Sequence, residues 1–146
     1  MNLFENLQTF YENDVWKDKN GKIYQICKQV RDEFVNKFGQ GTCLAGHCID
    51  ASDRIVELLS NIGIKAKTIE GWCVYDDEYY GSDRPYDEHT WVELDDGTYI
   101  DVTADQFNDG MWDENKLPEI IIGNKPDCMV YNEPELDDDG FIINKY

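Results

Sequence analysis

Apolar positions recur at helical spacing in the first half of the chain. In the segment 23–38 they return every three or four residues, and two glycines follow, which predicts an amphipathic helix. The segment 48–62 has the same period and precedes Gly63, a residue suited to the left-handed C-terminal cap of a helix. Residues 2–12 predict a third, shorter helix.

The second half alternates apolar and polar residues, as strands do. Residues 64–75 predict a long strand with a break at Gly71, and residues 76–88 an exposed acidic loop. Two further strands, 89–94 and 98–102, flank an Asp-Asp-Gly turn. Because Asp-Gly suits the backbone of a tight turn, these two strands are expected to form a β-hairpin.

The pattern weakens after the hairpin. Residues 117–122 predict one more strand, at an edge because it contains proline, and residues 133–140 an acidic turn followed by a small apolar docking patch, 141–143. Helices followed by an antiparallel sheet are typical of an α+β domain. We therefore expect a single domain over 1–146: N-terminal helices, then a central helix packed on an antiparallel sheet. Its core is expected at about 40–107, with an acidic C-terminal extension at about 108–146.

Charge narrows the functional classes. The formal net charge is −18, from 31 acidic and 13 basic residues, which argues against nucleic-acid binding because contacts with phosphates need clustered lysine and arginine. A basic peptide or protein partner is compatible with this charge, and so is solubility alone.

Other compositional features bear on location. No stretch approaches the roughly 18 apolar residues of a membrane span, and the first residues lack the features of a secretory signal. The five cysteines are unevenly spaced and odd in number, a poor disulfide framework that fits a reducing compartment. The expectation is a cytoplasmic protein that does not bind membranes.

Cys48 is placed where a reactive thiol would be expected. It follows Gly46 and opens the predicted central helix. The positive end of the helix dipole and the unpaired N–H groups there favour a thiolate, and the same N–H groups can bind an oxyanion. The alternative is a buried structural cysteine, since cysteine is among the residue types most often buried.

His89 and Asp101 lie at the adjoining ends of the predicted hairpin. In a regular antiparallel pair they are cross-strand neighbours. An aspartate that accepts from one ring nitrogen fixes the tautomer and leaves the other nitrogen to a thiol. With Cys48 they would form a nucleophilic triad; otherwise, His89 is a satisfied structural residue and Asp101 caps a turn.

These residues carry a resemblance that covers about half of the chain, 40–107. The chain resembles the transglutaminase-like cysteine enzymes of the papain-like superfamily. The resembling positions are Gly46-x-Cys48, Ala51-Ser52, Leu58-Leu59, Gly63-Ile64-x-Ala66, Gly71, His89-x-Trp91-Val92-Glu93 and Asp101-x-Thr103. The resemblance implies that Cys48 is the nucleophile, His89 the general base and acid, and Asp101 the group that orients His89. The chain departs from the family at Val102, where proline is usual, and at His47 beside the nucleophile.

The supporting groups stay open. The backbone N–H of Cys48 is one expected oxyanion donor, and candidates for the second are Gln40, Trp16 and His47. Gln106 is a candidate for lining the cleft. Trp72 and Trp91 are expected in the sheet core, and three tyrosines of the acidic segment are candidates for a substrate rim. These tyrosines are Tyr79, Tyr80 and Tyr86.

The predicted chemistry is attack by the Cys48 thiolate on a peptide or glutamine amide, which gives a thioester. Water would then produce proteolysis or deamidation, and an amine would produce transamidation. No cofactor is implied. One alternative is a non-catalytic acidic binding module or nucleic-acid mimic on the same fold. Another is a zinc site from Cys43, His47, Cys48 and one further ligand, although Cys-x3-His-Cys is not an established zinc spacing.

Overall fold

The computed structural model describes residues 21–76 and 84–144, so the predicted helix at 2–12 lies outside these residues. The helical elements are α3 (Lys22–Phe38), η1 (Gly41–Leu44), α4 (Cys48–Asn61), η2 (Ala104–Gly110) and η3 (Asp113–Asn115). The strands are β1 (Ala66–Val74), β2 (Tyr86–Leu94), β3 (Tyr99–Asp101), β4 (Ile121–Gly123), β5 (Met129–Val130), β6 (Glu135–Leu136) and β7 (Ile142–Asn144).

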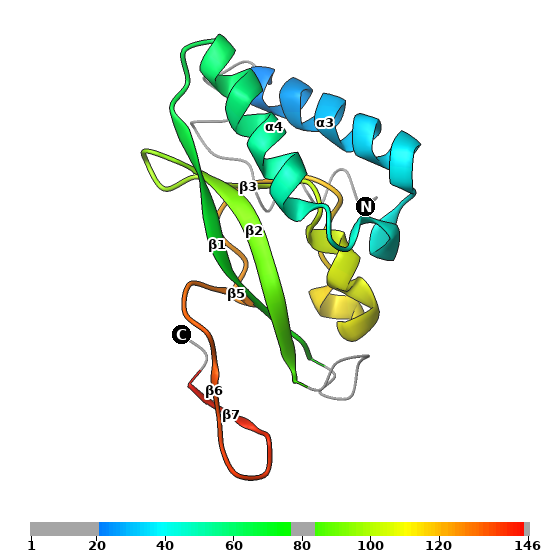
Figure 1. Ribbon diagram of the computed structural model, residues 1–146, viewed down its shortest axis with the longest axis vertical. Coiled ribbons are helices and arrows are strands. Elements are labelled where there is room, and N and C mark those ends of the chain that lie inside the picture. Colours follow the sequence, from blue (N-terminus) through cyan, green and yellow to red (C-terminus); the bar gives the residue numbers. More distant parts are fainter. Residues whose placement is uncertain (1–20, 77–83, 145–146) are drawn as a thin grey trace.

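Two layers make up the described part of the chain. Helices α3 and α4 lie side by side on one face of a five-stranded antiparallel sheet, in the order β4-β3-β2-β1-β5 (Figure 1). This confirms the α+β class predicted from the sequence. Among the described residues, no helix is both long and apolar enough to span a membrane.

The core between the layers is built from the apolar faces of both helices. Val30 of α3 and Ile55 and Leu59 of α4 are almost fully buried and belong to one cluster with Val92 and Ile100 of the sheet. Ile55 and Leu59 are four residues apart, so they lie on the same face of α4, as the apolar pattern predicted.

The end of α4 has the predicted glycine cap. Gly63 has φ +81°, and its N–H donates to the Ser60 carbonyl at 3.0 Å. The N–H of Ile64 donates to the Leu59 carbonyl at 2.9 Å. These two bonds satisfy carbonyls that the helix leaves unpaired, so the chain turns sharply into β1.

Strand β1 is continuous, so the predicted break at Gly71 is wrong. Gly71 pairs with His89 inside the β1–β2 ladder. Its role is steric, because a Cβ atom there would lie 2.2 Å from Cη2 of Trp91 and 2.6 Å from the Val130 carbonyl oxygen. The missing side chain lets the Trp91 indole pack directly over the strand.

The predicted hairpin is confirmed, but its first strand is longer than expected. β2 begins at Tyr86, so residues 86–88 belong to the sheet and not to the acidic loop. The turn is held by Asp96, which accepts from the backbone N–H and the hydroxyl of Thr98.

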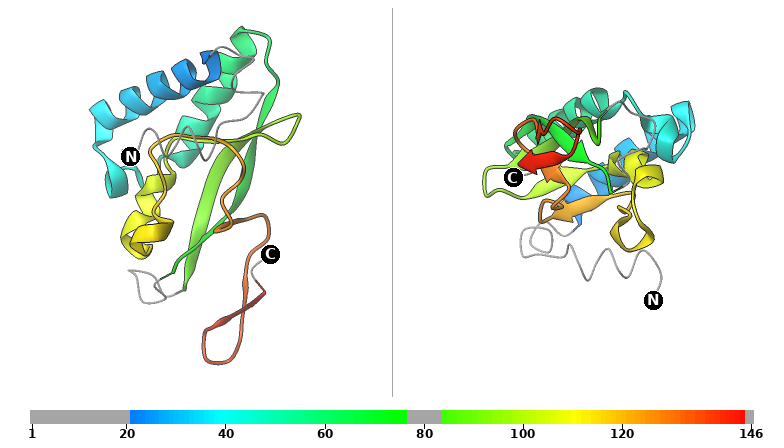
Figure 2. Two further views of the ribbon diagram at one scale, coloured as in Figure 1. Left: turned by 180° about the vertical axis from the view of Figure 1, so that it is seen from behind. Right: turned by 90° about the horizontal axis from the view of Figure 1, so that it is seen from below.

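The face of the sheet opposite the helices is also covered. Trp91 and Tyr99 point to this face and pack with Phe107 and Met111 of the segment that follows β3. Figure 2 shows the short helices of this segment, in yellow, beside the sheet and next to η1.

The remaining strands come from the C-terminal part of the chain. β4 is an edge strand, as predicted for 117–122, but it begins only at Ile121, and β5 forms the other edge. β6 and β7 form a separate small hairpin (Figure 1). In the predicted docking patch, Ile142 packs against the cluster around Val74, while Phe141 and Ile143 are exposed.

Candidate active site

Cys48 is the first residue of α4, and its side chain is half-buried. The N–H groups of a first helical turn have no partner inside the helix, and His47 gives α4 no side-chain cap among the described residues. One turn later, the Ser52 hydroxyl donates to the Thr90 carbonyl at 3.3 Å. This bond holds the start of α4 against β2, so the thiol lies at the meeting point of helix and sheet.

His89 lies in β2 and is 1% exposed. Its Nε2 donates to Oδ2 of Asp101 at 2.6 Å. Its other nitrogen, Nδ1, is buried and has no hydrogen-bond partner among the described residues. The Cys48 thiol is nevertheless close enough to the ring to shift the pKa of both groups, and such contacts are often long in free enzymes.

The contact between His89 and Asp101 is as predicted, but the register differs. Val92 pairs with Ile100, and Glu93 with Tyr99. Continued by one residue, this register puts Trp91, and not His89, opposite Asp101. His89 and Asp101 are therefore diagonal neighbours on one face of the sheet, a separation that long side chains bridge.

The carboxylate of Asp101 is 3% exposed and fully engaged. Oδ2 also accepts from the Tyr99 hydroxyl at 2.5 Å, and Oδ1 accepts from the Thr103 backbone N–H at 2.9 Å. Hydrogen bonds from neutral donors stabilise a buried carboxylate without removing its charge. Asp101 is thereby fixed in position and remains the counter-charge of His89.

The surroundings of Cys48 lower its pKa, and those of His89 raise its pKa. Burial raises the pKa of the Cys48 thiol, but the nearby His89 ring and the Thr90 backbone outweigh it, so the net shift is downward. Burial lowers the pKa of His89, but Asp101 and Cys48 outweigh it and raise this pKa to about 9. A lowered thiol pKa beside a raised imidazole pKa favours a thiolate–imidazolium pair near neutral pH.

The predicted oxyanion candidates have different surroundings. The ring of His47 stacks on Phe38 at 3.6 Å between centroids, and its backbone N–H donates to the Leu44 carbonyl at 3.0 Å. Gln40 is exposed, and its Oε1 accepts from Arg31 at 3.5 Å. Trp16 lies outside the described residues. The His47 backbone N–H is thus engaged within its loop, whereas the backbone N–H of Cys48 belongs to the first turn of α4 and has no partner inside the helix.

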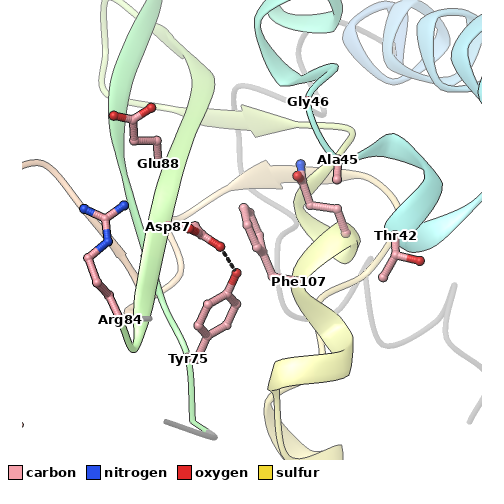
Figure 3. Close-up of a pocket in the computed structure, with 9 residues that line it drawn as sticks. Thr42, Ala45, Gly46, Tyr75, Arg84, Asp87, Glu88 and Phe107 are labelled. Carbon is pink, nitrogen blue, oxygen red and sulfur yellow. Dashed lines mark hydrogen bonds between the residues drawn. The ribbon is translucent and has the colours of Figure 1, made fainter. Parts of the chain in front are cut away.

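A pocket of about 420 Å³ opens beside these groups, between the β1–β2 end of the sheet and the η1 and η2 segments (Figure 3). Gly46 and Gln106 both line it, and Gln106 is held by a bond from its Nε2 to the Thr103 carbonyl at 2.9 Å. Phe107 forms one wall, and its ring meets His89 edge-on at 5.0 Å between centroids. The pocket therefore adjoins the predicted triad, because Phe107 contacts His89 and Gly46 precedes Cys48 by two residues.

The predicted tyrosine rim is only partly described. Tyr79 and Tyr80 lie outside the described residues, and Tyr86 is buried in β2, where it packs edge-on against Trp72 at 5.6 Å. Trp91 is fully buried, as expected, and Trp72 half-buried.

Sequence reasoning missed a buried ion pair under the site. Arg31 of α3 donates to both carboxylate oxygens of Asp105, at 2.6 and 2.8 Å, and to the Val102 carbonyl at 2.9 Å. It therefore ties the helix layer to the chain just after Asp101. A signal was present, since Arg31 lies four residues after Cys27 and so falls on the apolar stripe of its helix.

The described residues contain no cluster of three or more histidine, cysteine or acidic side chains that could hold a metal ion. Cys43, one of the residues considered for zinc, is exposed in η1.

Comparison of the chain with protein-family models, with curated proteins and with solved structures gave no match.

Proposed function

We propose that this protein is a cysteine hydrolase or acyltransferase that attacks an amide through Cys48, with His89 and Asp101 completing the triad. One observation carries the proposal. His89 binds Asp101 through Nε2 at 2.6 Å, while its buried Nδ1 is left to interact with a thiol at a helix N-terminus. The proposal includes a relationship of this α+β core to the transglutaminase-like enzymes, which the ordered motifs support.

The first step forms a thioester. The Cys48 thiolate attacks the amide carbonyl carbon, and the resulting oxyanion is stabilised by the backbone N–H of Cys48 and its neighbours in the first turn of α4. The His89 imidazolium gives its proton to the leaving nitrogen as the carbon–nitrogen bond breaks. Asp101 keeps the imidazolium oriented and balances its charge.

The second step releases the acyl group. Neutral His89 takes a proton from water or from an amine, which attacks the thioester carbon and displaces the Cys48 thiolate. Water gives proteolysis or deamidation, whereas an amine gives transamidation. The triad supports each outcome, because the acyl-enzyme is common to all of them.

The test is the rate of iodoacetamide labelling at each cysteine as a function of pH, read by mass spectrometry. Cys43, exposed in η1, is the internal reference. We expect Cys48 to react faster than Cys43 at neutral pH. His89→Ala removes the side chain that most lowers the Cys48 pKa, so the labelling curve should move to higher pH. The rate at pH 7 should then fall about tenfold for every pH unit by which the curve moves.

Asp101→Asn tests the other end of the triad. Without the carboxylate charge, the pKa of His89 should fall from about 9. The imidazolium then loses its proton at a lower pH, so the upper pH limit of the thiolate–imidazolium pair should fall. An NMR titration of His89 measures this change. Equal labelling of Cys48 and Cys43 in all three proteins would contradict the proposal and favour the acidic binding module instead, an alternative compatible with the net charge of −18.

A further inference from the structure

The pocket beside the triad contains a carboxylate that the proposed chemistry does not use. Asp87 is two residues before His89 in β2, so both side chains lie on the same face of the strand, about 7 Å apart along it. Gly46, which lines the pocket opposite, is two residues before Cys48. A group bound in this pocket would therefore lie next to the amide under attack.

Asp87 is held in place with one oxygen still available. The Tyr75 hydroxyl donates to its Oδ2, and Oδ1 accepts no hydrogen bond from the described residues. Figure 3 shows this pair next to the ring of Phe107. The rings of Tyr75 and Phe107 are themselves in edge contact, 5.9 Å between centroids.

This combination is suited to an organic cation. A half-buried carboxylate supplies the counter-charge and a charge-assisted hydrogen bond, and aromatic rings attract cations through their faces. The basic side chain of Arg84 contacts the rings of Trp72 and Tyr86 and lies 3.8 Å from Glu133. Arg84 also lines the pocket, although in Figure 3 its side chain lies on the other side of the strand from Phe107.

We propose that the Asp87–Tyr75–Phe107 pocket binds the ammonium or guanidinium group of a substrate side chain next to the amide that Cys48 attacks. The proposal rests on the function proposed above and adds the substrate class, a peptide with lysine or arginine at this position. Asp87 is then a specificity-determining residue, and Tyr75 positions it.

The experiment uses two thiol-reactive peptidyl vinyl sulfones that differ only in one side chain, lysine or its neutral analogue norleucine. The second-order rate of Cys48 modification is measured for each by mass spectrometry. We expect the wild-type protein to prefer the lysine probe about tenfold or more, the range of a charge-assisted hydrogen bond, and Asp87→Asn to bring this ratio close to one.

The matched control is Asp95→Asn, which removes one negative charge from the exposed hairpin turn, distant from the pocket. It should keep the wild-type ratio. Equal rates for the two probes in the wild-type protein would overturn the proposal, and so would a preference that persists in Asp87→Asn or disappears in Asp95→Asn.

A binding measurement separates this proposal from the proposed function. Cys48→Ser protein is titrated with Nα-acetyl-lysine methylamide, with the norleucine analogue and with n-butylamine, and followed by NMR at Phe107. Resonance changes that only the lysine compound causes would support the pocket even if Cys48 proved unreactive. A reactive Cys48 without such changes would refute the pocket alone, and equal changes with n-butylamine would assign it to free amines and overturn the assignment to a peptide side chain.

Discussion

The buried hydroxyl of Tyr99 interacts with the Asp101 carboxylate of the site. It donates to the same Asp101 oxygen that accepts from His89, so it withdraws negative charge from that oxygen. In Tyr99→Phe, the carboxylate should attract the imidazolium more strongly and raise the pKa of His89 above about 9. Loss of the buried bond should also lower the free energy of unfolding by about 1–3 kcal/mol.

An NMR titration of His89 and urea denaturation measure the two effects. Tyr131→Phe is the matched control, because its exposed hydroxyl donates to Glu93 at 2.7 Å, outside the triad. This variant should leave the pKa of His89 unchanged. A His89 pKa that does not move in Tyr99→Phe would show that the hydroxyl only fills space.

At this scale, part of the site could be predicted from the sequence. The contact of His89 with Asp101 followed from the Asp-Gly turn, which fixes the pairing of the two strands to within about two residues. Tyr99 was not predicted, although the strand period of two places it on the same face as Asp101. Whether its hydroxyl reaches the carboxylate depends on side-chain torsions, which the pattern does not contain.

The buried ion pair of Arg31 and Asp105 joins two elements that share no backbone pairing, α3 and η2. Arg31→Met would leave the Asp105 carboxylate buried without its counter-charge. Removing one partner of a buried pair typically costs about 3–5 kcal/mol, so we expect a loss of this size in the free energy of unfolding, measured by urea denaturation.

Lys28→Met is the control from the same helix. It breaks the exposed pair of Lys28 with Asp32, and exposed pairs contribute about 1 kcal/mol or less. The double variant Arg31→Met with Asp105→Leu should recover most of the lost stability, because no unpaired charge remains. Similar losses in the Lys28 and Arg31 variants would contradict a special role for the buried pair.

The elements themselves were predicted to different degrees. α3, α4 and the β2–β3 hairpin were predicted because each has a local signal, namely a helical period, a glycine cap or a turn. β5, with only two residues, exists because Met129 and Val130 meet β1 across more than fifty residues of chain. No local pattern specifies such a pairing, and the same holds for Arg31, whose partner is 74 positions away.

The site draws on every layer of the molecule. The thiol comes from the helix layer, the imidazole and carboxylate from the sheet, and the Phe107 wall from the segment that covers the other face. These parts meet at the end of the sheet where the described segments leave an open pocket. The geometry at Cys48 therefore depends on the packing of both faces, which explains why the spacing of motifs predicts the residues but not the pocket.

The net charge of −18 is a property of the whole molecule and leads to a prediction about substrate capture. A negative field should raise the local concentration of a cationic substrate, and salt should screen it. Between about 0.01 M and about 1 M NaCl the screening length falls from about 30 Å to about 3 Å. Modification of Cys48 by the lysine vinyl sulfone should slow several-fold over this range, while the norleucine probe serves as control and should change little. An equal response of both probes would mean that the acidic surface does not contribute to substrate capture.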